Sequence, residues 1–356
     1  MSYEHLFSPV SLGAFHLANR IVLAPMTRNR ATPDGIPFPY VADYYAQRAS
    51  GGLLISEATA ISKQGSGYPV IPGIWTAPQT EAWSAITKSV HDAGGKILLQ
   101  LWHTGRVAHS SLVGGQPVSS SAVAPNLEVL TASFEKVQAE TPRELTIAEI
   151  AEVVAAYKIG AENAKAAGFD GVELHGANGY LIDQFLRDGV NHRTDEYGGS
   201  IENRLRLALE VLTALTDVWG ADRVGIRLSP FGAFDDMSDS DPLNHFVAIL
   251  QALKPLNLAY VHFAFVTGVN EPDALKKFRE VYGHNIMTNG TYSGATAEAD
   301  LAAGLTDATA FGVPFLANPD LPERLKDGAP LNEAIPATFY GGNEVGYTDY
   351  PALAHS

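Results

Sequence analysis

The sequence predicts an α/β fold: a (β/α)8 or TIM barrel with an N-terminal capping hairpin and a lid inserted after strand three. Short apolar segments without a polar face alternate with helical patterns, as expected for parallel strands buried on both sides. Eight strand candidates occur in a chain of 356 residues, enough for one barrel. No change of composition marks a second domain, so residues 1–356 are expected to form a single domain.

Most of the expected strands are followed directly by an expected helix, and a capping box at Thr146 and Glu149 marks the start of one of these helices. The expected strands are Ile21–Met26, Leu53–Thr59, Ile97–Trp102, Gly171–His175, Val224–Ser229, Tyr260–Phe263, Asn285–Thr288 and Ala308–Phe311. The expected helices are Val41–Arg48, Gln79–Ala93, Thr146–Ala167, Ile201–Trp219, Pro242–Lys254, Glu271–Tyr282, Ala297–Ala303 and Pro319–Lys326.

A doubly wound open sheet is the alternative arrangement of the same elements. That fold usually carries Gly-x-Gly-x-x-Gly after an early strand to hold a dinucleotide. The nearest match, Gly65-Ser66-Gly67, lacks the third glycine. The barrel is therefore favoured.

Two segments fall outside the alternation. Residues 3–18 read as a hairpin that turns near Gly13 and plugs the barrel floor. Residues 107–143 are rich in Ser, Gly, Pro and Val and show no helical period. Connections of this length are usually lids or binding loops, so we expect this one to cover the catalytic face.

Charge and composition exclude several classes of function. The net charge of −15 argues against nonspecific nucleic-acid binding. The absence of cysteine rules out disulfides, cysteine nucleophiles and thiolate metal sites. We see neither a signal peptide in MSYEHLFSPVSLGAF nor an apolar stretch approaching the ~20 residues of a membrane span. A cytoplasmic location without membrane partners is the expectation.

Polar side chains at the C-terminal ends of the strands point to a flavin site, because barrel active sites lie at that face. The Gln100 amide can pair with an imide-like ring edge. Arg227 can place positive charge beside a ring that gains negative charge on reduction, and Thr27 can donate to a ring carbonyl. Asn289-Gly290 and Phe311-Gly312 end strands seven and eight, the usual phosphate site of barrels. Gln100 or Arg227 alone would more often be a satisfied core polar group, and their common placement at strand ends is what favours the flavin site.

Three residues at the end of strand four suit substrate activation. His175 and Asn178 can both bind one carbonyl or nitro oxygen and stabilise charge that develops on it. Tyr180 carries a phenol that can protonate carbon. Trp102 and Tyr340 are candidates for the pocket wall, although aromatic residues more often serve packing alone.

Other barrel chemistries fit the sequence poorly, and no metal is expected. A metal-dependent hydrolase needs a third ligand beside His103 and His175, and none is evident. A Schiff-base aldolase needs a buried lysine, whereas Lys63 looks solvated.

Long motifs give the chain a family resemblance. It resembles the old yellow enzyme family of FMN-dependent ene-reductases, and is most similar to the bacterial N-ethylmaleimide reductase and pentaerythritol tetranitrate reductase branch. The resemblance covers nearly the whole chain. Its motifs are NRIVLAPMTRNRA (19–31), QRASGGLLISEAT (47–59), GYPVIPGIWTAPQ (67–79), LLQLWHTGR (98–106), residues 171–204, WGADRVGIRLSP (219–230), ANPDLPERL (317–325) and FYGGNEVGYTDYP (339–351).

The resemblance implies noncovalent FMN, NADPH as the hydride donor with NADH possible, and small electron-poor alkenes as substrates. It implies that His175 and Asn178 hold the activating oxygen of the substrate and that Tyr180 donates the proton. The protein would be a monomer or a homodimer. The residues implied at the flavin are Pro25, Met26 and Thr27 on the ring, Ala58 and Gln100 on the pyrimidine side, Arg227 near N1 and O2, and Asn289, Gly290, Phe311, Gly312 and Val313 around the phosphate.

One position departs from the family pattern. The family usually reads Phe-Gly-Arg after strand eight, with the arginine on the FMN phosphate, whereas this chain has Phe311-Gly312-Val313. Weaker retention of FMN is the expected consequence. A noncatalytic FMN-binding or small-molecule-binding protein on a reductase scaffold is the alternative function, and Val313 is the only hint of it.

Overall fold

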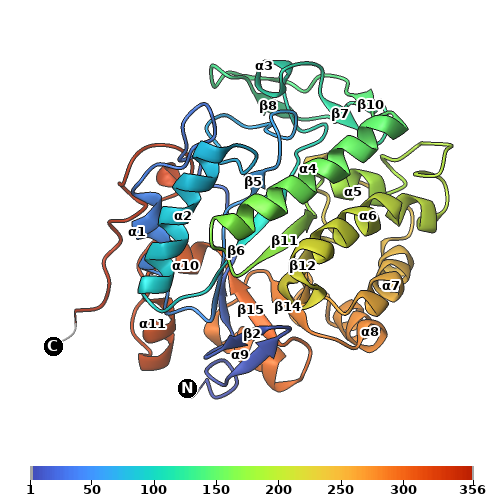
Figure 1. The fold of residues 1–356 in the computed structure, drawn as a ribbon. Coiled ribbons are helices and arrows are strands. Elements are labelled where there is room, and N and C mark those ends of the chain that lie inside the picture. The colour runs from blue at the N-terminus through green and yellow to red at the C-terminus, as the bar shows by residue number, and fades with distance from the viewer. Residues whose placement is uncertain (1–2, 355–356) are drawn as a thin grey trace.

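The computed structural model describes residues 3–354, and its centre is a closed barrel of eight parallel strands (Figure 1). Each strand is hydrogen-bonded to the next, and the last returns to the first, which excludes the open sheet. A short ninth strand, β5 (Thr59–Ala60), pairs with β6 outside this ring. The barrel strands are β3 (Ile21–Leu23), β4 (Leu53–Ile55), β6 (Ile97–Trp102), β11 (Gly171–Gly176), β12 (Val224–Leu228), β13 (Tyr260–Ala264), β14 (Ile286–Asn289) and β15 (Ala308–Phe311).

The first two strands are shorter than the sequence predicted. β3 ends at Leu23 rather than Met26, where Pro25 lacks the N–H that a strand ladder needs. β4 ends at Ile55 rather than Thr59, and Glu57 beyond it accepts from the backbone N–H of Arg28 at 3.0 Å. The segments after the two strands are therefore hydrogen-bonded to each other, and both contribute residues to the pocket wall.

All eight expected helices are present, with ends that shift by a few residues. The capping box at Thr146 and Glu149 forms as predicted. Among the described residues, no helix is long and apolar enough to cross a bilayer. The expected helices are α1 (Val41–Ala46), α2 (Ala77–Asp92), α4 (Ile147–Ala166), α6 (Ile201–Trp219), α7 (Pro242–Leu253), α8 (Pro272–Tyr282), α9 (Gly294–Ala302) and α11 (Leu321–Asp327).

Several short helices were not predicted, because they are too brief to show a helical period. Two of them start at the C-terminal ends of barrel strands and position site residues: α5 (Leu181–Leu186) and α10 (Val313–Ala317). The others are α3 (Ser110–Val113) and the 3-10 turns η1 (Ala221–Arg223), η2 (Phe234–Asp236), η3 (Lys254–Leu256) and η4 (Pro336–Thr338).

The predicted hairpin closes the barrel floor. β1 (Val10–Leu12) and β2 (Phe15–Leu17) pair antiparallel around Gly13, whose φ of 56° is the left-handed region that favours glycine. Leu12, Phe15 and Leu17 are buried against side chains inside the barrel. The pocket must therefore open at the other end.

The lid forms where it was expected, between β6 and α4. It contains α3 and two small strand pairs: β7 (Val118–Ser119) with β10 (Arg143–Glu144), and β8 (Glu128–Leu130) with β9 (Lys136–Gln138). The β8–β9 hairpin carries Leu130 and Phe134 to the rim of the cavity described next.

Candidate active site

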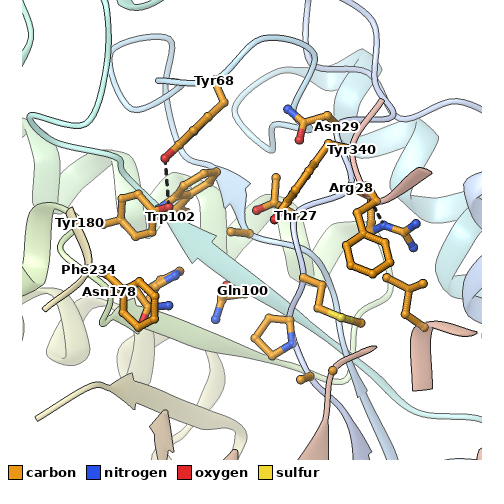
Figure 2. Close-up of a pocket in the computed structure, with 18 of the residues that line it drawn as sticks. Thr27, Arg28, Asn29, Tyr68, Gln100, Trp102, Asn178, Tyr180, Phe234 and Tyr340 are labelled. Atoms are coloured by element: carbon orange, nitrogen blue, oxygen red, sulfur yellow. Dashed lines mark hydrogen bonds between the residues drawn. The ribbon is translucent and has the colours of Figure 1, made fainter. Parts of the chain in front are cut away.

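A cavity of about 640 Å³ lies at the C-terminal ends of the barrel strands. All the predicted site residues except Gly290 and Phe311 line it (Figure 2). Phe311 is buried beside Tyr292, and Gly290 faces Thr267 just outside the lining. The lining residues among the predictions are Pro25, Met26, Thr27, Ala58, Gln100, Trp102, His175, Asn178, Tyr180, Arg227, Asn289, Gly312, Val313 and Tyr340.

The Gln100 amide is oriented by a buried carboxylate. Its Nε2 donates to Glu173 Oε1 at 2.7 Å, while Tyr260 Oη and His262 Nδ1 lie 3.0 and 2.9 Å from Glu173 Oε2. Burial alone would raise the pKa of Glu173, but His262, Arg227 and Gln100 together hold it below the ordinary value. An ionised Glu173 fixes which end of the amide is the donor, so the Gln100 oxygen is left to accept from a ligand.

Arg227 is held from one side only. Its Nη2 donates to Asn289 Oδ1 at 2.7 Å, and Asn289 Nδ2 donates to the Ala310 carbonyl at 2.8 Å. The Arg227 Nε–H is buried and has no partner among the described residues. Buried donors are rarely left unpaired, so this one marks the position of a ligand acceptor.

His175 is a neutral hydrogen-bond donor. The Ala177 backbone N–H donates to His175 Nδ1 at 3.3 Å, so the ring hydrogen resides on Nε2. Burial, with a further contribution from the Arg227 charge, lowers the pKa of His175 and keeps the ring uncharged. Asn178 stands beside it with φ of 58°, a conformation that asparagine tolerates, and its backbone N–H donates to Ser229 Oγ at 2.7 Å.

Tyr180 completes this wall of the pocket. Its ring centroid lies 4.8 Å from that of Trp102 and 5.0 Å from that of His175, edge-on to both. Its hydroxyl is 3.3 Å from the hydroxyl of Tyr68 (Figure 2). Burial raises the pKa of both phenols, so both remain protonated at neutral pH. Tyr180 can therefore act as an acid.

The end of the pocket at α10 carries an apolar side chain, Val313. Val313 begins this helix and is 45% exposed. The lining contains two arginines, Arg28 and Arg227. Arg28 donates to the backbone carbonyls of Phe339 at 2.9 Å, Thr338 and Gly346. A phosphate here would rely on neutral donors or on Arg28 Nη1, which has no hydrogen-bond partner among the described residues.

Sequence reasoning missed a second set of lining residues, because most of them lie on loops rather than at strand ends. Tyr68 and Pro69 belong to a quoted motif, GYPVIPGIWTAPQ, in which no residue was assigned a role. Glu173 was also missed, although a lone charge within the apolar strand GVELHG is a visible signal. The missed lining residues are Ala24, Arg28, Asn29, Tyr68, Pro69, Leu130, Phe134, Phe234, Phe265, Leu316, Phe339 and Gly341.

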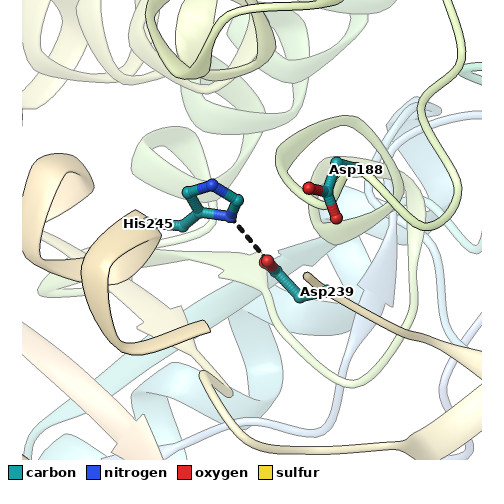
Figure 3. A group of neighbouring side chains, drawn as sticks. All are labelled: Asp188, Asp239 and His245. Carbon is teal, nitrogen blue, oxygen red and sulfur yellow. Dashed lines mark hydrogen bonds and ion pairs between the residues drawn. The ribbon is translucent and has the colours of Figure 1, made fainter. Parts of the chain in front are cut away.

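One group of metal-type ligands lies outside this pocket (Figure 3). His245 Nδ1 is 2.5 Å from Asp239 Oδ1, and the Ser240 backbone N–H donates to Asp188 at 2.9 Å. The Arg204 guanidinium lies 3.3 Å from His245 Nδ1, and its charge opposes a metal ion there. These contacts tie the loop before α7 to the end of α5, and we interpret the group as a structural network.

Comparison with known proteins identifies the family. Residues 5–332 match the sequence profile of the NADH:flavin oxidoreductase / NADH oxidase family. A putative 12-oxophytodienoate reductase 11 of Oryza sativa subsp. japonica is 44% identical, covering 98% of this chain and 97% of that protein. The flavin oxidoreductase hxnT of Emericella nidulans is 45% identical, covering 98% and 97%.

Solved structures agree in fold and sequence. Morphinone reductase in complex with tetrahydroNAD superimposes with a TM-score of 0.94 at 46% identity, covering 98% of both chains. The old yellow enzyme homologue from Zymomonas mobilis has a TM-score of 0.94 at 44% identity, covering 98% of this chain and 99% of that one. The chain belongs to the NADH:flavin oxidoreductase / NADH oxidase family, the family of old yellow enzyme.

Proposed function

We propose that this flavin oxidoreductase is an ene-reductase, which uses FMN and a reduced nicotinamide to reduce the C=C bond of alkenes activated by a ketone, aldehyde, imide or nitro group. The observation that carries the proposal is the convergence of His175, Asn178 and Tyr180 on one wall of the pocket. Two neutral donors and one protonated phenol are the groups that such a reduction needs. The names of similar proteins, among them 12-oxophytodienoate and morphinone reductases, support it.

The pocket fits FMN at the ring end. The Gln100 amide, fixed by Glu173, would pair with the pyrimidine edge, and the free Nε–H of Arg227 would bind near N1 and O2. Pro25, Met26 and Thr27 would pack on the ring, with Ala58 beside it. When bound, FMN supplies the hydride chemistry that no side chain of this pocket can supply. The fit is weaker at Gly312 and Val313, where the phosphate is expected.

The residues opposite the ring would bind and protonate the substrate. His175 Nε2–H and the Asn178 amide would bind the activating oxygen and stabilise the negative charge that grows on it during reduction. Tyr180 would donate its proton to the α-carbon, and Tyr68 stands within hydrogen-bond reach to restore that proton. Ala177 enforces the donor tautomer of His175, so binding and activation depend on backbone geometry as well as on side chains.

NADPH and NADH are both candidate hydride donors. A 2′-phosphate on NADPH needs a cation or several N–H donors. Within the described pocket lining, the cations are Arg28 and Arg227; both are buried and partly engaged by other residues, and the free Nε–H of Arg227 is assigned to FMN. We therefore propose little discrimination in favour of NADPH, with the nicotinamide using the same pocket as the substrate.

A visible absorption spectrum of the purified holoprotein tests the function. We expect a flavin band near ~450 nm that bleaches on anaerobic addition of NADPH or NADH and returns with 2-cyclohexenone. A protein that binds FMN but is never reduced would favour the alternative, a noncatalytic FMN-binding protein. A protein that remains colourless after incubation with FMN and removal of the unbound flavin would contradict both.

A further inference from the structure

Three phenylalanines stand at the mouth of the pocket and are unusually exposed. Phe134, Phe234 and Phe265 line the cavity, yet their exposed fractions are 56%, 47% and 41%. They come from separate segments: the β8–β9 turn, η2 in the β12–α7 loop, and the residue after β13. Exposed large apolar side chains that gather at a cavity usually mark a binding surface.

The backbone at this mouth is held in conformations that side chains rarely adopt. Phe134 has φ of 65° and Phe265 has φ of 61°, both in the left-handed region. Asp235 and Asp236, which follow Phe234, have φ of 55° and 59°. Such outliers in residues with a Cβ persist only where the surroundings enforce them, and they gather at functional sites.

The surroundings do enforce the conformation of the β12–α7 loop. Arg106 is 1% exposed, and its guanidinium donates to the Val123 carbonyl in the lid and to the carbonyls of Asp235 and Asp236 at 3.1 and 2.8 Å. The Asn126 backbone N–H in the lid donates to the Asp236 carboxylate at 2.9 Å. The lid and the loop are thus fastened together at the mouth.

Phe234 and Phe265 form a pair above the substrate residues. Their ring centroids are 5.2 Å apart with an interplanar angle of 36°. The Phe265 backbone N–H donates to the Asn289 carbonyl at the end of β14, which fixes its position. Gly179, next to Tyr180, has room only for hydrogen, because an added Cβ would lie 2.8 Å from the Phe234 carbonyl oxygen. Phe234 therefore stands directly against the turn that carries the proton donor.

We propose that Phe134, Phe234 and Phe265 form an aromatic clamp, a preformed subsite for a flat apolar group carried by the substrate. The preferred substrates would be activated alkenes with an aromatic or fused alicyclic substituent rather than compact enones. Rings without charge suit the clamp, because Asp235 beside it would repel an anionic substituent and its apolar faces cannot solvate ions. The proposal rests on the proposed ene-reductase function and names the substrate class of the same site.

Paired substrates test the clamp in the holoenzyme. The selectivity is the ratio of kcat/KM for 4-phenyl-3-buten-2-one to that for 2-cyclohexenone. We expect this ratio to be roughly tenfold lower in the Phe234→Ala/Phe265→Asn double variant, which is about the effect of no longer burying one ring face of the substrate. Asparagine is chosen because it tolerates the left-handed conformation at position 265. Leu243→Ala is the control: Leu243 is 39% exposed on nearby α7 but does not line the pocket.

A binding measurement separates failure of the clamp from failure of the function. Calorimetric titration compares 4-phenylphenol with phenol and requires no turnover. The wild-type protein and the Leu243→Ala variant should bind 4-phenylphenol roughly tenfold more tightly, and the double variant should bind both about equally. An unchanged affinity ratio in the double variant would overturn the clamp, whether or not the enzyme reduces alkenes. A normal affinity ratio without reduction of either alkene would refute the ene-reductase function alone.

Discussion

Val313→Arg is the sharpest test of how this chain holds its cofactor. Val313 is the first residue of α10, at the end of β15 where barrels commonly bind phosphate. A charged hydrogen bond to a phosphate contributes roughly 1.5–3 kcal/mol. Because the position is 45% exposed, solvent screens part of that energy. We therefore expect a gain near the lower end, about tenfold in the affinity for FMN.

Titration of the apoprotein with FMN and with riboflavin, followed by flavin fluorescence, measures this gain. Riboflavin shares the ring and the ribityl chain but lacks the phosphate, so Val313→Arg should tighten the binding of FMN and leave riboflavin unchanged. Val313→Gln is the control for side-chain length without charge. The gain should also shrink as salt is raised, because the new contact is partly exposed.

Two outcomes would refute this reasoning. If Val313→Arg tightens FMN and riboflavin equally, the new side chain packs on the cofactor without meeting the phosphate. If neither affinity changes and the wild-type protein already prefers FMN strongly, another group holds the phosphate. The buried Arg28 is the first candidate, since its Nη1 has no partner among the described residues.

The remaining predictions concern the substrate wall and its support. Tyr180→Phe should slow reoxidation of the reduced enzyme by 2-cyclohexenone roughly 10²- to 10⁴-fold, with reduction by nicotinamide nearly unchanged in stopped-flow traces. The His175→Ala/Asn178→Ala variant should lose the charge-transfer band given by phenols, and a retained band would place the oxygen site elsewhere. Burial raises the pKa of Glu57 to about 7, so its stabilising contribution is complete below pH ~4.5 and is lost as the pH rises to about 7. The free energy of unfolding, measured in urea, should therefore fall between pH ~4.5 and about 7, and the fall should be roughly 3 kcal/mol smaller in Glu57→Gln. An equal fall in both proteins would exclude Glu57 as its source.

The barrel was predictable because its strands are buried on both faces. Apolar segments such as Leu53–Ile55, alternating with helical patterns, favour buried parallel strands, and eight of them fit a barrel, while the missing dinucleotide motif argues against an open sheet. Strand ends were less predictable. β3 stops early because Pro25 has no N–H for the sheet, and beyond the end of β4 the Glu57 carboxylate accepts from the Arg28 backbone. Where such a strand ends thus depends on tertiary contacts, which a local sequence pattern does not show.

The site residues, like the barrel, were predictable only where strand positions determine them. Residues at strand ends, such as Gln100 and Arg227, could be predicted because a barrel brings those ends together whatever the loops do. The residues that orient these side chains could not be predicted from the sequence. Glu173 orients Gln100 only because β6 and β11 place the two residues side by side in register. The spacing along the chain says nothing about which neighbour a buried carboxylate will meet.

The pocket mouth shows most clearly why loops resist prediction from sequence. Nothing in the sequence around Phe134 or Phe265 announces a left-handed backbone, and the preference of phenylalanine argues against one. At the neighbouring loop, where Asp235 and Asp236 are also left-handed, Arg106 binds carbonyls from segments far apart in the chain. Family motifs fix the chemistry at the barrel ends, whereas these long-range contacts shape the entrance. The substrate range of this chain should therefore depend on the entrance more than on the residues that define its family.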